Sequence, residues 1–573
     1  MAPQIGNAAD PVLTRIVQQD RTSWYQKRNL RVLYALLLPC CIGIEMTSGF
    51  DSQMINTVQI SPAWQTCEIT QYCRSCGNTD TKGALLGIIS AAYNLGAICA
   101  LPFVPYVNDT YGRRWAIFLG SWIMVVGALV QAFSIGPAMY VVARWILGFG
   151  IPFCIIAGSS LMGELAYPKE RPIMTSLFNA LYFVGALVAA GVSFGTQHLN
   201  SDWAWRIPSL LQAGPSMLQI IFIFFIPESP RYLISKDKRD EAFRILVHYH
   251  AEGNSQSDFA LAEMAQIEST IRLELQYSQS SWFDMISTPG MRKRVLVGSF
   301  LGLFTQWSGN TLISYYLSDL LKLIGYDDPN FKGKLNVGLN SWNLFNAVGI
   351  SLLVRRFPRR VMYLTCATAL LCCYVGWTVA MQQFLDRHTQ VAAKITIFFI
   401  FAYQPCYNIG YNALTYTFLV ELFPFAQRAR GITIFQLFGR SAGFFTTFVN
   451  PIGLRAVSWR WLITYCCWLA FEIVFIYLLF PETYGRTLEE LAFLFETDAR
   501  AEEVRQRVEK QLQREVGDFD FDFDRASVNR QSDTPLVPRG HSRTRVTAGG
   551  RDRVIDERWE TGGWAGDDHS RWP

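Results

Sequence analysis

Residues 164–171 read ELAYPKER and residues 421–428 read ELFPFAQR. Both stretches begin with a glutamate, contain a proline, and reach an arginine seven positions after the glutamate. Two further motifs return 254 positions downstream: Trp205-Arg206 as Trp459-Arg460, and Pro227-Glu228-Ser229 as Pro481-Glu482-Thr483. Long apolar runs separate these motifs, so the sequence predicts a duplicated membrane unit with a period of about 250 residues.

The composition favours a membrane protein. Of the 573 residues, 50% are hydrophobic and only 17% are charged, whereas a soluble domain carries about 25% charged residues. Apolar stretches reach the length of about 20 residues that a helix needs to cross a bilayer. The net charge of +5 is explained by basic loops. Since no stripe of Lys and Arg is interleaved with stacking aromatics, we expect a lipid bilayer and no nucleic acid as partner.

Hydropathy predicts an all-α protein with twelve membrane spans. They lie near residues 33–55, 83–105, 115–134, 138–162, 173–197, 207–227, 295–324, 335–355, 361–382, 391–420, 430–450 and 460–480. Basic residues cluster after the even-numbered spans: Arg113/Arg114, Lys169/Arg171, Arg355/Arg356/Arg359/Arg360 and Arg428/Arg430. Because short cytoplasmic loops carry the excess of Lys and Arg, both termini and the central loop are predicted to be cytoplasmic.

These spans divide the chain into five segments. Residues 1–32 form an N-terminal tail, 33–227 a first six-helix lobe, 228–292 a linker, 293–480 a second lobe, and 481–573 a C-terminal tail. Within the linker, residues 237–250 and 259–277 are predicted to form surface helices. The end of the tail is rich in Arg, Ser, Gly and Asp, which cannot build a core, so we expect it to be largely disordered.

The cysteines and histidines indicate neither a metal site nor an enzyme. Ten of the 13 cysteines lie in predicted spans, where a thiol serves as a small packing group. Cys67, Cys73 and Cys76 share the first external loop, where two of them could pair; a zinc site would need a fourth ligand. A phosphate-binding loop and a nucleophile motif are both missing from the sequence, and only six histidines occur. We therefore expect no cofactor and no catalytic residues.

Six motifs occur in a fixed order along the spans: Gly49-Phe50-Asp51, residues 109–114 (DTYGRR), residues 144–150 (RWILGFG), residues 227–231 (PESPR), residues 306–310 (QWSGN) and residues 481–490 (PETYGRTLEE). In this order the chain resembles sugar porters of the major facilitator superfamily, most of all the fungal lactose and hexose permease-like members. The resemblance implies two pseudo-symmetric six-helix lobes and a plasma-membrane protein that works as a monomer. It further implies secondary transport of a hexose, pentose or disaccharide by alternating access.

Asp51 is conspicuous because its span is otherwise apolar. A carboxylate at membrane depth is costly and usually faces a partner inside the bundle, and Arg144 is the natural candidate. Proton-coupled members of the resembled family carry Asp at this position, and several facilitative members carry Asn. The resemblance therefore implies proton symport, in which protonation of Asp51 releases Arg144 and the proton is the coupling ion. A fixed structural pair is the alternative.

Sugar recognition requires amide and hydroxyl groups, because a buried polar group left unpaired by the wrong ligand is costly. The candidate sugar ligands are Asn179, Gln306, Asn310, Thr311, Asn343, Asn412 and Tyr416. By resemblance, Gln306 and Asn343 match sugar-binding positions in residue type, and Asn179 falls where the family commonly has Gln. Polar residues that join membrane helices are the alternative interpretation. Tyr315 and Tyr316 are expected to form an external gate.

Charged residues near the predicted cytoplasmic face complete the pattern. The resemblance implies that they latch the lobes together when the inside is shut, and the candidates are Asp109, Arg113, Arg114, Glu164, Arg171, Glu228, Arg231, Arg359, Arg360, Glu421, Arg428 and Glu482. Positive-inside bias and contact with lipid headgroups could explain the arginines, but not the repeated glutamates.

Several positions depart from the family pattern. Tyr416 stands where glucose carriers have Trp, and residues 355–360 (RRFPRR) lack the Asp and Gly of residues 109–114. On an ideal helix Asn310 would point about 100° away from Thr311. Arg440, deep in a span, could attract an acidic sugar or serve as a structural charge. A facilitative carrier, a quinate or sugar-acid carrier, and a nutrient sensor with the same fold therefore remain open as alternative functions.

Overall fold

The computed structural model describes residues 22, 24–58, 81–199, 201–277, 282–326, 328–387 and 389–485, together with Leu491 and Phe495. The three loop cysteines, Cys67, Cys73 and Cys76, and the predicted disorder at the end of the tail fall outside these ranges. The chain divides into two units, Met1–Gly517 and Asp518–Pro573. Every described residue belongs to the first unit.

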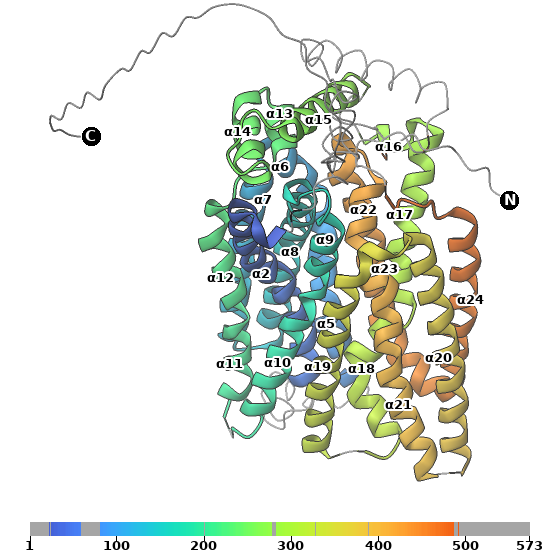
Figure 1. The fold of residues 1–573 in the computed structure, drawn as a ribbon. Helices are drawn as coiled ribbons and strands as arrows, with labels where there is room; N and C mark the ends of the chain where they lie inside the picture. Colours follow the sequence, from blue (N-terminus) through green and yellow to red (C-terminus); the bar gives the residue numbers. More distant parts are fainter. Residues whose placement is uncertain are drawn as a thin grey trace, which may run out of the picture. The chain divides into compact units, whose positions relative to one another are not determined.

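The described residues are helical and contain no strand, and the helices form two groups (Figure 1). The N-terminal lobe, coloured blue to teal, follows a short turn η1 (Trp24–Gln26). Its elements are α2 (Arg28–Val58), α5 (Thr81–Ala100), α6 (Val104–Tyr111), α7 (Arg113–Ala132), α8 (Pro137–Leu165), α9 (Arg171–Ala180), α10 (Tyr182–Thr196), α11 (Trp203–Leu211), α12 (Ala213–Phe222) and η2 (Ile223–Phe225).

The C-terminal lobe extends from light green to orange in Figure 1. Its elements are α17 (Pro289–Trp307), α18 (Asn310–Leu323), α19 (Pro329–Leu353), η3 (Val354–Arg356), α20 (Arg359–Arg387), α21 (Gln390–Tyr407), the π-helical turn η4 (Asn408–Asn412), α22 (Thr415–Leu422), α23 (Phe425–Val457), η5 (Ser458–Arg460) and α24 (Trp461–Leu479).

All twelve predicted spans fall on one helix or on consecutive helices. In the described part, eight helices are long and apolar enough to cross a membrane, and nine if the pair 87–100 and 104–111, bent by 49°, counts as one span. The other three predicted spans are broken or polar. The first is interrupted between α17 and α18, the second contains η4, and the third, α23, carries Arg428, Arg430 and Arg440.

Linker helices cover one end of the bundle (Figure 1). They are α13 (Pro230–Ser235), α14 (Arg239–His250), α15 (Asp258–Tyr277) and α16 (Asp284–Ser287), and α14 and α15 lie where the sequence predicts surface helices. Apolar residues of α13, α14 and α15, among them Leu233, Leu246 and Ile267, form a small core of their own. The carboxylate of Glu252 accepts from the backbone N–H groups of Asn29 and Leu30 at 3.0 and 3.2 Å, which ties the linker to the start of α2.

The two lobes meet along a partly polar seam. Helices α2, α5, α8, α9 and α10 of one lobe face α18, α19, α22 and α23 of the other. Side-chain hydrogen bonds cross it from Gln53 to Asn336 at 2.7 Å and between the hydroxyls of Thr175 and Thr417 at 2.7 Å. A seam with exchangeable polar contacts costs less to hydrate than an apolar one, so it suits lobes that separate at one end.

Candidate functional site

A polar cavity of about 160 Å³ lies on the seam. This volume is comparable to the roughly 150 Å³ cavity that holds a benzene molecule in an engineered protein. Its polar and aromatic lining comes from both lobes: Glu45, Ser48, Ser52, Asn94, Asn179, Tyr182 and Phe183 from the first, and Thr305, Gln306, Asn310, Thr311, Ser314, Tyr315, Tyr407, Tyr411, Asn412, Thr415, Tyr416, Phe435, Gln436, Arg440 and Thr447 from the second. A ligand here would therefore be held by both lobes at once.

Six of the seven predicted sugar ligands line this cavity: Asn179, Gln306, Asn310, Thr311, Asn412 and Tyr416. The seventh, Asn343, is not among the lining residues. It is buried on α19, where its backbone carbonyl accepts a hydrogen bond of 3.5 Å from Asn408 Nδ2. The structure therefore places Asn343 against η4 instead of in the cavity.

A helix break brings Gln306, Asn310 and Thr311 to the same cavity. Gly309, between α17 and α18, has φ +96°, a left-handed conformation that favours glycine. A Cβ atom there would lie 1.6 Å from the hydroxyl oxygen of Tyr374, so a larger residue does not fit. An unbroken helix would turn Asn310 away from Thr311, but the break lets both line the cavity with Gln306.

Amide and hydroxyl groups in the lining are held by one another. Asn179 Nδ2 on α9 donates across the seam to the carbonyl oxygen and to Oδ1 of Asn412, at 2.6 and 3.0 Å. Gln436 Nε2 donates to the Tyr416 hydroxyl at 3.0 Å, and Thr311 Oγ1 donates to Gln306 Oε1 at 3.4 Å. This network orients polar atoms before a ligand arrives, which reduces the cost of binding.

The two tyrosines that were expected to form an external gate have different positions. Tyr315 lines the cavity, and its hydroxyl donates across the seam to Ser52 Oγ at 3.3 Å. Tyr316 is buried, has non-helical backbone angles within α18, and donates to the carbonyl oxygen of Thr447 in its own lobe at 2.6 Å. In the described contacts, Tyr315 thus bridges the lobes, and Tyr316 bonds within its own lobe.

Asp51 and Arg144 form a buried ion pair beside the cavity. Asp51 on α2 and Arg144 on α8 are 1% and 0% exposed. Gln212, at the junction of α11 and α12, donates through Nε2 to Asp51 Oδ1 at 2.6 Å. The Arg144 guanidinium lies over the ring of Tyr93, 5.1 Å from its centre, and Arg440 of the other lobe approaches the same ring at 5.6 Å. Tyr93 therefore connects this pair with a residue of the cavity wall.

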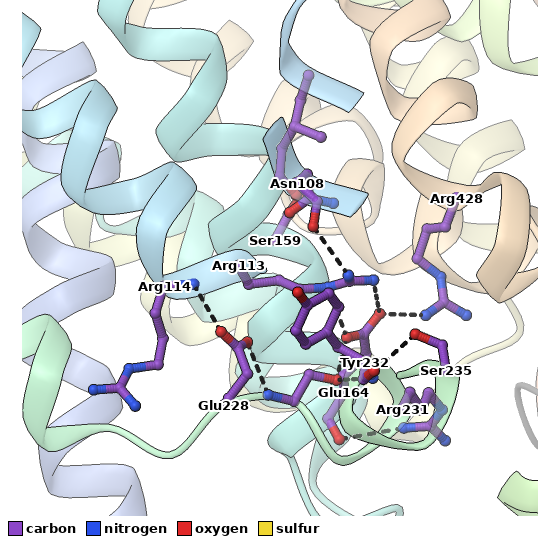
Figure 2. Close-up of polar contacts among 12 residues, drawn as sticks. Asn108, Arg113, Arg114, Ser159, Glu164, Glu228, Arg231, Tyr232, Ser235 and Arg428 are labelled. Atoms are coloured by element: carbon purple, nitrogen blue, oxygen red, sulfur yellow. Dashed lines mark hydrogen bonds and ion pairs between the residues drawn. The ribbon is translucent and has the colours of Figure 1, made fainter. Parts of the chain in front are cut away.

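The Glu164 cluster consists of Arg113, Glu164, Ser229, Arg231 and Arg428. Figure 2 labels all of them except Ser229. Glu164 Oε2 forms an ion pair with Arg113 Nε at 3.3 Å. Its Oε1 accepts from Arg113 Nη2 at 3.5 Å and, across the seam, from Arg428 Nη1 at 2.9 Å. Ser229 caps α13 and also donates to Glu164 Oε2 at 2.5 Å. Arg231 donates to the Glu164 carbonyl oxygen at 3.2 Å. One carboxylate thus joins both lobes and the linker.

Glu228 supports this cluster from the loop that follows α12. Its Oε2 accepts from the backbone N–H of Arg114 at 3.2 Å, and its Oε1 accepts from the Ser229 N–H at 3.0 Å (Figure 2). Burial raises the pKa of Glu228, and the hydrogen bond from Ser229 opposes that shift. Arg114 Nη2 donates to the Phe224 carbonyl at 2.8 Å, which holds the start of α7 to the end of α12.

The Glu421 cluster of the C-terminal lobe consists of Arg359, Glu421 and Thr483. Glu421 accepts from Arg359 Nη2 at 3.3 Å and from Thr483 Oγ1 at 2.6 Å. Glu482 supports it as Glu228 supports the first, because it accepts from the backbone N–H groups of Arg359 and Arg360 at 2.9 and 3.1 Å. The sequence repeat is thus reproduced as a structural repeat.

The last two latch candidates, Asp109 and Arg171, lie apart from these clusters. Asp109 Oδ2 on α6 pairs across the seam with Arg430 Nη2 at 3.6 Å. Arg171 is buried at the first residue of α9, and its carbonyl accepts from Thr175 Oγ1 at 2.9 Å. In the sequence repeat, Arg171 corresponds to Arg428 and Glu164 corresponds to Glu421. Arg428 pairs with Glu164 across the seam, and the ion pair that the structure describes for Glu421 is with Arg359.

Sequence reasoning missed several lining residues and one partner of the ion pair. Glu45 gave a usable signal, because it is a carboxylate in the same apolar span as Asp51. Gln212 and Asn94 are single amides in predicted spans, where helix packing explains an amide equally well. Ser48, Ser52 and Thr447 carried no signal. In the described part of the chain, no group of three or more His, Cys, Asp or Glu could hold a metal ion.

A family model described as "Sugar (and other) transporter" matches residues 36–495. The chain belongs to this family. This sugar transporter family member is 27% identical over 447 residues to the hexose transporter HXT9 of Saccharomyces cerevisiae, covering 74% of this chain and 77% of that protein. It is 26% identical over 425 residues to the MFS-type transporter criB of Aspergillus cristatus, covering 72% and 85%. The family comprises membrane transporters and not enzymes.

Solved structures match this family member over most of its length. The proton:xylose symporter XylE bound to 6-bromo-6-deoxy-D-glucose has a TM-score of 0.71 at 20% identity, covering 82% of this chain and all of that one. The inward-open conformation of XylE from E. coli has a TM-score of 0.60 at 20% identity, covering 81% of this chain and all of that one. The chain therefore has the two-lobed, all-helical fold of the major facilitator superfamily.

Proposed function

We propose that this protein carries a sugar, a hexose, pentose or disaccharide, across the plasma membrane by alternating access and as a proton symporter. The observation that carries the proposal is the seam cavity, whose amides and hydroxyls come from both lobes. Hydroxyl-rich ligands need many such partners, because each buried polar atom left without one is costly. The hexose transporters and the xylose symporter among its relatives support the same substrate class.

Alternating access requires contacts at both ends of the cavity that can break in turn. Glu164 and Arg428 join the lobes at the end covered by the linker. Gln53 and Asn336, and Ser52 with Tyr315, join them along α2. We propose that the linker end faces the cytoplasm, together with both termini, because the arginine-rich loops lie there. We also propose that the protein functions as a monomer, because both lobes that line the described cavity belong to one chain.

The Asp51–Arg144 pair is the proposed coupling site. A buried carboxylate that gains a proton loses its attraction for the guanidinium, so Arg144 would be released toward Tyr93. Because Tyr93 also contacts Arg440 of the cavity wall, a movement of Arg144 can reach the sugar site through one aromatic ring. Proton binding and lobe movement would be coupled in this way.

The proposal is tested by uptake of labelled sugars in cells that lack their own sugar transporters. We expect uphill accumulation that a protonophore abolishes. Asp51→Asn should abolish accumulation and retain exchange of labelled for unlabelled sugar, because the amide mimics a carboxyl that is always protonated. Accumulation by Asp51→Asn would refute the coupling role. Accumulation by wild type despite the protonophore would indicate another coupling ion, and equilibration without uphill accumulation would indicate a facilitator.

A further inference from the structure

Two groups of opposite charge face the proposed sugar site. Among the described residues that line the cavity, only Glu45 and Arg440 are acidic or basic residues. Glu45 on α2 is 3% exposed, and its Oε1 has no hydrogen-bond partner among the described residues. A buried carboxylate oxygen without a partner is costly. Such an atom, directed at a cavity, indicates a ligand that donates a hydrogen bond to it.

Arg440 presents the complementary group from the other lobe. Its Nε donates to Gln436 Oε1 at 3.2 Å, and its guanidinium packs on the Tyr93 ring. Gln436 in turn donates to the Tyr416 hydroxyl. These contacts fix the direction of the guanidinium, so that it remains at the cavity wall with donor groups available to a ligand.

Glu45 and Arg440 lie at similar depth in the bundle. With a rise of ~1.5 Å per residue, Glu45 lies roughly 26 Å along α2 from Arg28, and Arg440 lies roughly 22 Å along α23 from Phe425. Both side chains line the same cavity. Within the described part they form no direct ion pair, which leaves room for a ligand group between them.

We propose that Glu45 and Arg440 act together as a selectivity pair for a neutral polyhydroxy ligand. One ligand hydroxyl donates to the Glu45 carboxylate, and a neighbouring ligand oxygen accepts from the Arg440 guanidinium. The inference rests on the proposed function and narrows it, because a balanced pair of charges disfavours a sugar acid. A carboxylate on the ligand would be repelled by Glu45, and an ammonium group would be repelled by Arg440.

The first test uses wild-type protein alone. Uptake of the neutral sugar that the cells accumulate best is measured in competition with D-glucuronate, D-glucosamine and unlabelled neutral sugar. We expect each charged analogue to compete at least tenfold more weakly than the neutral sugar, since hydrogen bonds to charged groups carry roughly 10- to 100-fold in affinity. Competition by D-glucuronate as strong as that by the neutral sugar would overturn the proposal.

The second test separates the two charges. In Glu45→Gln the Arg440 charge is uncompensated, so competition by D-glucuronate should strengthen roughly tenfold. In Arg440→Gln the Glu45 charge is uncompensated, so competition by D-glucosamine should strengthen. The double variant Glu45→Gln/Arg440→Gln is again balanced and should favour neither analogue. Glu241→Gln, which removes an exposed carboxylate on α14, is the matched control and should behave as wild type.

The outcomes distinguish this inference from the proposed function. If the single variants take up the neutral sugar and competition by the charged analogues is unchanged, the selectivity pair is refuted. The proposal of sugar transport is not affected by that result. If a variant reaches the membrane but transports nothing, the purified protein is examined by ligand-induced shifts of Tm with the same three probes, and equal shifts by D-glucuronate in wild type and Glu45→Gln would also overturn it. Failure of wild type to take up any hexose, pentose or disaccharide would instead refute the proposed function.

Discussion

The Glu164 and Glu421 clusters are two copies of one design, and they differ in what they join. In both, the arginine that begins a helix and a hydroxyl from the segment after the lobe's last helix reach the same glutamate. Arg113 and Ser229 do so for Glu164, and Arg359 and Thr483 for Glu421. Only the Glu164 cluster also receives a described arginine from the other lobe, Arg428. Among the described contacts, the lobes are therefore joined at the linker end by Arg428 and Arg430 of the C-terminal lobe, which reach Glu164 and Asp109 of the N-terminal lobe.

The loops that begin the two clusters explain part of the difference. Gly112 has φ +95°, and a Cβ there would lie 2.7 Å from Glu228 Oε2, so the tight turn next to Arg113 requires glycine. The corresponding residue in the second copy is Pro358. Asp109 makes a second pair across the seam, with Arg430, whereas its counterpart Arg355 has the opposite charge. The second copy thus stabilises its own lobe. At position 355 it cannot form the ion pair with an arginine that Asp109 forms across the seam.

Glu164→Gln should have the largest effect. It leaves the buried guanidiniums of Arg113 and Arg428 without their carboxylate, and breaking such a pair costs about 3–5 kcal/mol. A cysteine placed at Ser351, which is buried on the seam near the linker end, should then react roughly 10²- to 10³-fold faster with a thiol reagent added from the cytoplasmic side. The labelling rate of the native cysteines is measured separately and subtracted. If the rate for Ser351→Cys is then unchanged by Glu164→Gln, Glu164 does not hold the lobes closed.

Glu421→Gln should lower stability more than it changes opening. Its described partners, Arg359 and Thr483, belong to its own lobe, so the loss of about 1.5–3 kcal/mol is shared by the open and closed states. We expect a lower Tm of the purified protein, with a change in labelling of Ser351→Cys of less than about tenfold. Acceleration as large as that of Glu164→Gln would show that the two clusters act equally.

His250→Gln should weaken support for the first cluster only. His250 Nδ1 lies 2.7 Å from Glu263 Oε2, and Nε2 lies 3.2 Å from the carbonyl oxygen of Leu165, next to Glu164. The imidazole thus lies between the Glu263 carboxylate and the Leu165 carbonyl, with one ring nitrogen toward each. Glutamine cannot reproduce this bridge, because both of its donor hydrogens are on a single nitrogen. We expect the free energy of unfolding, measured by thermal unfolding, to fall by about 1–2 kcal/mol. Combining the variant with Glu164→Gln should lower it no further than Glu164→Gln alone.

Asp109→Asn should have the smallest effect of this series. The Asp109 side chain is 39% exposed and lies 3.6 Å from Arg430, and exposed ion pairs contribute about 0–1 kcal/mol. Labelling of Ser351→Cys should rise by less than about fivefold, and the increase should disappear in high salt. A double-mutant cycle with Arg430→Gln measures the pair directly, and a coupling larger than that of Glu164 with Arg428 would invert the proposed order.

Much of this arrangement could be predicted from the sequence because it depends on patterns. Long apolar runs gave the spans, and the seven-residue interval in residues 164–171 and 421–428 gave both glutamate clusters. The pairs of Arg428 with Glu164 and of Arg430 with Asp109 could not be predicted, because the sequence does not show which lobe each arginine reaches. The same applies to Asn343: its type matches the family pattern, but the face that α19 turns to η4 is a matter of packing. Glu45 could have been found, since the rule that singled out Asp51 applies to it equally.

Counterflow in proteoliposomes tests the central claim most directly. Proteoliposomes that contain purified wild-type protein are loaded with an unlabelled hexose, pentose or disaccharide, and entry of the labelled sugar is followed. The same measurement is made with Gln306→Ala, which removes a cavity amide. The account predicts saturable counterflow of at least one neutral sugar by wild type, with an affinity weakened roughly tenfold in Gln306→Ala. Counterflow that Gln306→Ala leaves unchanged, or none with any sugar, would contradict a sugar site between the lobes.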